Sequence, residues 1–197
     1  MALTAMVQAS QLVLLVHGTL FLRQAMGESL RATGVCLLPL VTAPAAGTFL
    51  SGYLLDRFGS IPVPALIGLS AGTLGALAWT AALPSLEYGW QVPGMVLAGL
   101  GMGMPVPALS AEMMHAVPAY KRTDASVLRQ TFRQLGGALG LASAGAVVLS
   151  ANDDAQDAAG VVSDSATPAA FLVAGCVLGL ALLLALVMLP RLWPTPG

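Results

Sequence analysis

Six long apolar segments, separated by short polar breaks, constrain the fold of this sequence more than any other feature. An α-helix needs about 20 predominantly apolar residues to cross a bilayer. The segments that meet this requirement are residues 3–22, 33–55, 62–83, 91–115, 130–151 and 168–190. A soluble chain carries about one quarter charged residues, whereas this chain of 197 residues is 9% charged and 57% hydrophobic. Membrane-spanning strands would be shorter and half polar. The sequence therefore predicts an all-α integral membrane protein, with residues 1–197 forming a single bundle of six transmembrane helices.

The basic residues predict the orientation of this bundle. Cytoplasmic loops of membrane proteins are enriched in Lys and Arg, and the basic residues divide six to two between the alternate sides of the predicted helices. The six are Arg57, Lys121, Arg122, Arg129, Arg133 and Arg191, and the two are Arg23 and Arg31. We therefore expect a multi-pass protein of the plasma (cytoplasmic) membrane with both termini cytoplasmic. The acidic DDAQD stretch that starts at Asp153 is expected in a solvated outer loop.

Several classes of function lack a signal in the sequence. The chain has no GxxxxGK[ST] loop for ATP, and it has no run of basic and aromatic residues that predicts nucleic-acid binding. Cys36 and Cys176 both lie in apolar runs and match no metal or disulfide spacing. We therefore expect no cofactor, no metal, no nucleic-acid partner and no enzymatic activity.

Small residues recur at spacings that favour close helix packing in lipid. Three sets share a helix face: Gly68, Gly72 and Gly75; Gly136 and Gly140; Gly175 and Gly179. Packing within one bundle is the first interpretation and dimerisation is the second. A denser run, Gly99 to Pro107, weakens the middle of the fourth segment. Such breaks are tolerated where the backbone lines a cavity or is buried in protein.

Three ionisable side chains in or at the start of the segments are candidates for function, because such groups are costly in a membrane. His17 lies well inside the first segment, where it is either a coupling residue or a neutral histidine bonded to a neighbouring helix. Arg129 and Arg133 are four residues apart and share one helix face. They either extend to lipid phosphates or bind a carboxylate or an anionic ligand group.

The stretch GYLLDRFG resembles the loop between the second and third helices of each half of a major facilitator superfamily transporter. The matching residues are Gly52, Leu54, Asp56, Arg57 and Gly59. The positions that follow, 60–62, are Ser, Ile and Pro and do not supply the basic residues of that pattern. The resemblance implies that this loop, with Gly52, Asp56, Arg57 and Gly59, helps to close the cytoplasmic side of the carrier.

Two further stretches resemble the fourteen-helix drug:proton antiporters of the EmrB/QacA-like group. The stretch ASVLRQTFRQLGGALGLA is similar to that group's RQLGG segment through Arg133, Gln134, Gly136, Gly137 and Gly140. The stretch FLRQAMGESLRATGVCLLPL is similar to the segment that joins the first two helices of the group's C-terminal six helices. Its matching residues are Gln24, Gly27, Gly34 and Pro39.

These resemblances imply the C-terminal half of a proton-coupled efflux carrier that works by alternating access. They imply a hydrophobic small-molecule substrate, surrounding lipid, and either a missing N-terminal half or a second copy of the chain as partner. The expected transport and coupling residues are His17, Gln24, Arg133 and Gln134. Gly136, Gly137 and Gly140 are expected to pack helices. The Gly/Pro run, His17 and Arg133 are expected on the face toward the partner.

Two other interpretations remain open at this stage. One is a small accessory or binding protein that uses the same bundle to hold another subunit. The other is an inactive, truncated gene product. A membrane enzyme would need His, Asp or Glu side chains clustered at one depth, and the sequence offers no convincing cluster.

Overall fold

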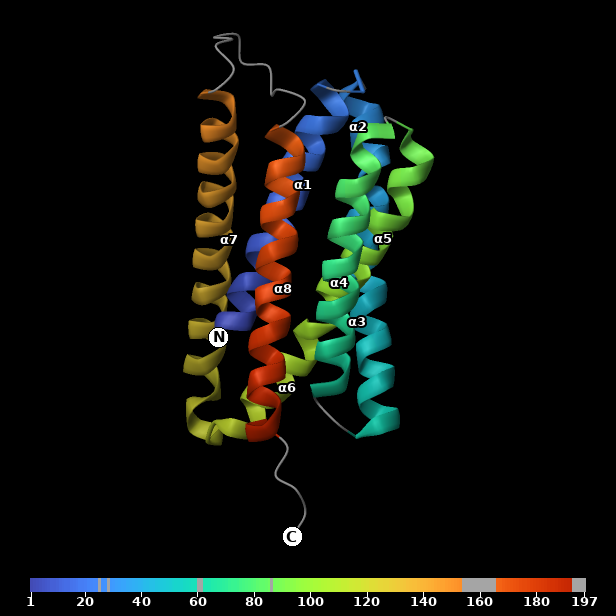
Figure 1. Ribbon diagram of the computed structural model, residues 1–197. Helices are drawn as coiled ribbons and strands as arrows, with labels where there is room; N and C mark the ends of the chain where they lie inside the picture. Colours follow the sequence, from blue (N-terminus) through green and yellow to red (C-terminus); the bar gives the residue numbers. More distant parts are fainter. Residues whose placement is uncertain (25, 28, 60–61, 86, 154–165, 193–197) are drawn as a thin grey trace.

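The protein is a bundle of antiparallel helices (Figure 1), described here by a computed structural model for residues 1–24, 26–27, 29–59, 62–85, 87–153 and 166–192. The α-helices are α1 (Ala2–Gln24), α2 (Leu30–Cys36), α3 (Leu38–Phe58), α4 (Pro62–Ala82), α5 (Tyr88–Gly103), α6 (Pro105–Ala116), α7 (Arg122–Asp153) and α8 (Ala166–Leu192). They form six membrane-spanning units, with α2 and α3 in one and α5 and α6 in another. The predicted all-α membrane fold is confirmed. The DDAQD stretch beyond Asp153 lies outside the described residues.

Two of the six spans are broken near a proline. Pro105 begins α6 directly after Met104, at the centre of the Gly/Pro run. Proline has no N–H to continue the helical ladder, so the weak point predicted in the fourth segment becomes a helix boundary. A second boundary at Leu37, just before Pro39, separates α2 from α3 and was not predicted.

Helix α5 is held between α3 and α4 by contacts that leave no room for a side chain. A Cβ at Gly75 would overlap the backbone of Ala98, and a Cβ at Gly101 would overlap Gly72. On the other side, a Cβ at Gly103 would overlap the carbonyl group of Pro44. Residues 101–105 are all buried. The glycines of the run therefore pack α5 inside the bundle, which corrects the expectation that they face a partner.

Helix α7 packs against α1 through a second set of glycines. A Cβ at Gly136 would overlap Ala5, and a Cβ at Gly140 would overlap Ala9. Gly137 lies against the side chain of Leu12. Helix α8 contacts α1 and α7, and its contact with α4 joins this group to the α3–α4–α5 group.

The core between the two groups is filled by large side chains from α4 and α8. The rings of Trp79 and Phe171 meet edge to face with centroids 4.5 Å apart. The indole Nε1 of Trp79 donates to Oε1 of Gln91, which is fully buried on α5. This pair satisfies two polar groups that would be costly to leave unpaired in an apolar interior.

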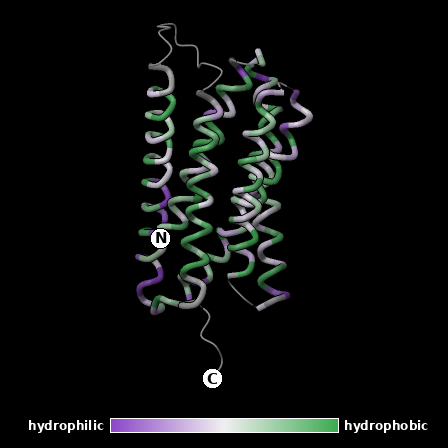
Figure 2. Tube along the Cα trace, in the orientation of Figure 1, coloured by the Kyte–Doolittle hydropathy of each residue, from purple (hydrophilic) through white to green (hydrophobic). Residues whose placement is uncertain are grey.

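Two spans, α2–α3 and α7, are the least buried. Only 28% and 22% of their most apolar windows are buried, against 39–56% for the other spans. Among the described residues, α3 and α7 share no substantial packing, and they lie at opposite sides of the view in Figure 1. Hydrophilic residues on α7 gather in its lower half (Figure 2). The surface of the bundle between α3 and α7 is called the open face below, because the two spans that border it are the least buried.

Candidate functional site

A recess between α1, α6 and α7 is the best candidate for a functional site. Its narrow inner part has a volume of about 20 Å³, which is room for one water molecule. It is lined by Thr4, Val7, Gln8, Gln11, Pro105, Val106, Leu109, Arg129 and Arg133. A wider part of about 300 Å³ shares Thr4, Leu109 and Arg129 and adds Met1, Leu3, Glu112, Met113 and Ala116. The two parts together are called the recess.

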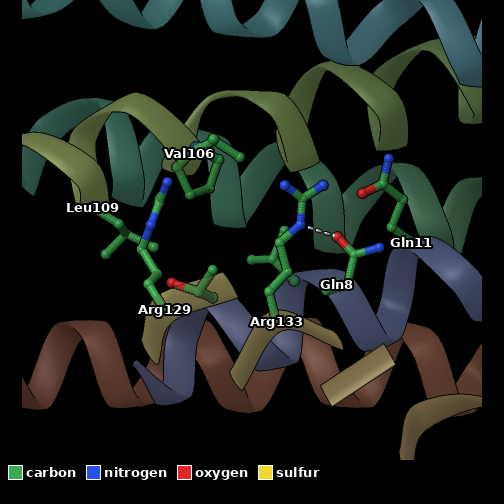
Figure 3. A pocket seen from close by; sticks show the side chains of 9 residues that line it. Gln8, Gln11, Val106, Leu109, Arg129 and Arg133 are labelled. Atoms are coloured by element: carbon green, nitrogen blue, oxygen red, sulfur yellow. Dashed lines mark hydrogen bonds between the residues drawn. The ribbon is translucent and has the colours of Figure 1, made fainter. Parts of the chain in front are cut away.

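Arg133 is held in the recess by a contact between two helices. Its Nε donates a hydrogen bond to Oε1 of Gln8, which projects from α1 (Figure 3). This contact depends on the close approach of α1 and α7 at Gly136, one turn further along α7. Figure 3 shows the two terminal nitrogens of Arg133 pointing away from Gln8. The Nε edge of the guanidinium is thus fixed by Gln8, and the two terminal nitrogens are not involved in this contact.

Arg129 lies one turn before Arg133 and faces the same recess. Its Nη1 donates to the hydroxyl of Ser110 on α6 at 2.6 Å, and that hydroxyl donates to the carbonyl oxygen of Val106. Both arginines are half-buried, and no ion pair to either is present among the described residues. The hydrogen-bond partner of each guanidinium is therefore an uncharged group. Glu112 lines only the wide part of the recess.

The other predicted transport residues lie elsewhere. His17 is buried inside the bundle at 6% exposure, with Nδ1 3.1 Å from the carbonyl oxygen of Val13. It does not lie on the open face where it was expected. Gln134 is exposed on α7 beside Arg133. Gln24 is the last residue of α1, and its side chain lies outside the described part of the structure.

The predicted inner-gate loop forms the end of α3. Gly59 terminates the helix with φ 61°, a left-handed conformation that suits glycine, and its N–H donates to the carbonyl of Leu55 at 2.9 Å. Asp56 and Arg57 are both exposed, and Arg57 donates to the hydroxyl of Tyr53 at 3.2 Å. The glycine of the motif thus has a local structural role, while the two charged side chains are available to another surface. Gly52 is half-buried, and a Cβ there would meet open space.

Gln8, Gln11 and Ser110 were not predicted from the sequence. Gln8 and Gln11 are three residues apart in a mostly apolar segment, so they share a helix face. Amides in a membrane helix normally face protein or water, and this signal was sufficient to place α1 against a polar site. Ser110 gave no comparable signal, because a serine hydroxyl can bond within its own helix.

The side chains of the recess are arranged in a way that suits binding. The described residues contain no group of three His, Cys, Asp or Glu side chains that could hold a metal ion. The recess instead offers guanidinium and amide donors beside apolar walls. Such a surface suits reversible recognition of a small molecule.

Comparison with known proteins identifies the family. The family model for the Major Facilitator Superfamily matches residues 1–141, more than two thirds of the chain. The chain belongs to the major facilitator superfamily. The matched region contains both the DRFG stretch at the end of α3 and the RQLGG stretch of α7.

Curated members of the superfamily that are similar to this chain are named for drug resistance and export. Multidrug resistance protein Stp of Mycobacterium tuberculosis is 30% identical over 135 residues, which cover 68% of this chain and 25% of that protein. The tetracenomycin C resistance and export protein of Streptomyces glaucescens is 30% identical over 136 residues, with coverages of 67% and 24%. The methylenomycin A resistance protein of Bacillus subtilis is 29% identical over 131 residues, with coverages of 66% and 28%. The chain thus spans only about a quarter of the length of these relatives.

Proposed function

We propose that this chain forms one six-helix wall of a drug-efflux carrier. The wall completes a transport pathway when a second bundle, either an N-terminal half or a second copy, covers its open face. The carrier moves apolar small molecules out of the cell by alternating access, with a proton gradient as the energy source. It resides in the plasma membrane with both termini cytoplasmic, and no catalytic step is assigned to it.

The observation that carries this proposal is the polar recess in a bundle that belongs to a superfamily of transporters. Gln130 and Gln134 lie beside Arg133 on α7 and are exposed in the isolated bundle. Gln134 is about 18 Å along the helix from Arg122, at 1.5 Å per residue. Lipid cannot satisfy these amides, so a second protein surface or a water-filled cavity is required beside them.

The same reasoning explains why one bundle is not expected to transport alone. The resemblance to the EmrB/QacA-like group implies a site between two bundles that rock against each other. A single bundle has no second wall to move against. The greater length of the curated relatives is consistent with a larger transport unit.

Dye accumulation in two hosts tests this function. The chain is overexpressed in its source organism, where the proposed partner polypeptide would also be made, and in a foreign host that lacks its own efflux pumps. We expect accumulation of the neutral apolar dye Nile red to fall in the source organism, and this fall to disappear when a protonophore is added. In the foreign host accumulation should not change if the second bundle is a separate polypeptide, and it should fall there too if the second bundle is a second copy of the chain. No fall in the source organism, with the chain present in its membranes, would contradict the proposal.

A further inference from the structure

The arginines of the recess form no ion pair within the part of the chain that the structure describes. Arg133 bonds to Gln8 and Arg129 bonds to Ser110, and both partners are neutral. Their four-residue spacing places two like charges on one helix face, which is unfavourable for an isolated helix. A group with negative charge between them would remove this repulsion.

The geometry of Arg133 selects the kind of group. A guanidinium has five N–H donors in a planar fork, and this fork matches a carboxylate through two parallel hydrogen bonds. Gln8 occupies the Nε of Arg133, while the two terminal nitrogens point away from it (Figure 3). The fork is therefore oriented before a ligand arrives, which lowers the entropic cost of binding.

The walls of the recess indicate the rest of the ligand. Val106 and Leu109 of α6 face the two arginines, and Met113 lines the wide part. The volume of the wide part, about 300 Å³, is at the small end of the range for ligand pockets. Arg133 lines only the inner part and Glu112 lines only the wide part, so an anionic group is favoured beside Arg133.

We infer that the recess binds apolar organic molecules that carry a carboxylate, with the carboxylate at Arg133 and the apolar body against α6. This inference names a substrate class for the proposed export function and rests on that function for its biological meaning. The binding itself needs only the bundle described here. It can therefore be measured without transport.

Calorimetric titration of the chain in phosphatidylcholine nanodiscs provides the test. The probes are biphenyl-4-carboxylate and its neutral analogue biphenyl-4-carboxamide, with empty nanodiscs to subtract partitioning into lipid. A charge-assisted pair predicts that the carboxylate binds about tenfold or more tightly than the amide. Arg133→Gln should weaken carboxylate binding far more than amide binding and so remove the preference, and an unchanged circular dichroism spectrum would show that the variant is folded. Arg133→Lys should retain part of the preference, and Arg31→Gln, outside the recess, should retain all of it.

Two results would overturn the inference. One is equal affinity for the two probes, or a preference that persists in Arg133→Gln. The other concerns lipid as the source of the anion. If replacing part of the phosphatidylcholine with phosphatidylglycerol removes the difference in carboxylate affinity between the wild-type chain and Arg133→Gln, the arginines bind lipid headgroups. If this difference remains, the recess binds the solute. Failure of either kind leaves the dye-accumulation test of export unaffected.

Discussion

The close contact between α1 and α7 predicts a large effect for the smallest possible substitution. In Gly136→Ala the new methyl group would overlap the backbone of Ala5, so α7 must move away from α1. Overpacking of this kind costs about 1–3 kcal/mol. Gly145→Ala is a matched control on the same helix, because a Cβ there meets nothing within 4 Å. Alanine favours a helix over glycine by about 1 kcal/mol at both positions, and this gain cancels in the comparison.

The free energy of unfolding of the two variants should therefore differ by about 1–3 kcal/mol. It can be measured in mixed micelles of dodecyl maltoside and sodium dodecyl sulfate, with the tryptophan fluorescence, to which the buried Trp79 contributes, as the signal. The same shift should loosen the contact between Arg133 and Gln8, so carboxylate binding should weaken in Gly136→Ala and not in Gly145→Ala. Equal stability of the two variants would refute the contact between α1 and α7 as described here.

Three further predictions concern other parts of the bundle. Gln91→Leu should lower the free energy of unfolding by about 1–3 kcal/mol, measured in the same micelles, because the buried indole N–H of Trp79 loses its acceptor; no loss would contradict this role. Asp56→Asn should change the free energy of unfolding by less than about 0.5 kcal/mol, because the side chain is exposed. In an active assembly it should nevertheless alter cysteine accessibility from the cytoplasmic side, and normal transport with unchanged accessibility would rule out a gating role. The cysteine of Asn152→Cys, in a background without Cys36 and Cys176, should react with an impermeant reagent from outside the cell only. Labelling from the cytoplasm only would show that the predicted orientation is wrong.

The number and type of the helices could be predicted from sequence because each span needs its own apolar length. The boundaries inside the spans were harder. Pro105 lies in a dense Gly/Pro run and its helix break was expected, whereas Pro39 stands nearly alone and the break at Leu37 was not. A single proline near a helix start is often tolerated, so Pro39 alone does not predict a helix boundary.

The candidate site was predicted only in part. Arg133 and the glycines beside it were identified, because charge in an apolar segment and repeated glycine spacing are visible along one helix. Its partner Gln8 is 125 residues away, and no local pattern links the two. His17 is visible in the sequence, but a single ionisable residue in an apolar segment fits both a coupling role and a neutral, hydrogen-bonded position in the core. The sequence does not show how α1 packs, so it could not predict that His17 is buried.

The central claim is that this bundle is one wall of an exporter and does not transport by itself. The most direct measurement uses the purified chain in liposomes with an imposed pH gradient, after its size in mild detergent has been determined. We expect the monomeric bundle to give no gradient-driven flux of Nile red or of biphenyl-4-carboxylate, and we expect flux to require a second bundle. A stable monomer that drives proton-coupled flux alone would contradict this claim and would require a complete pathway within these six helices.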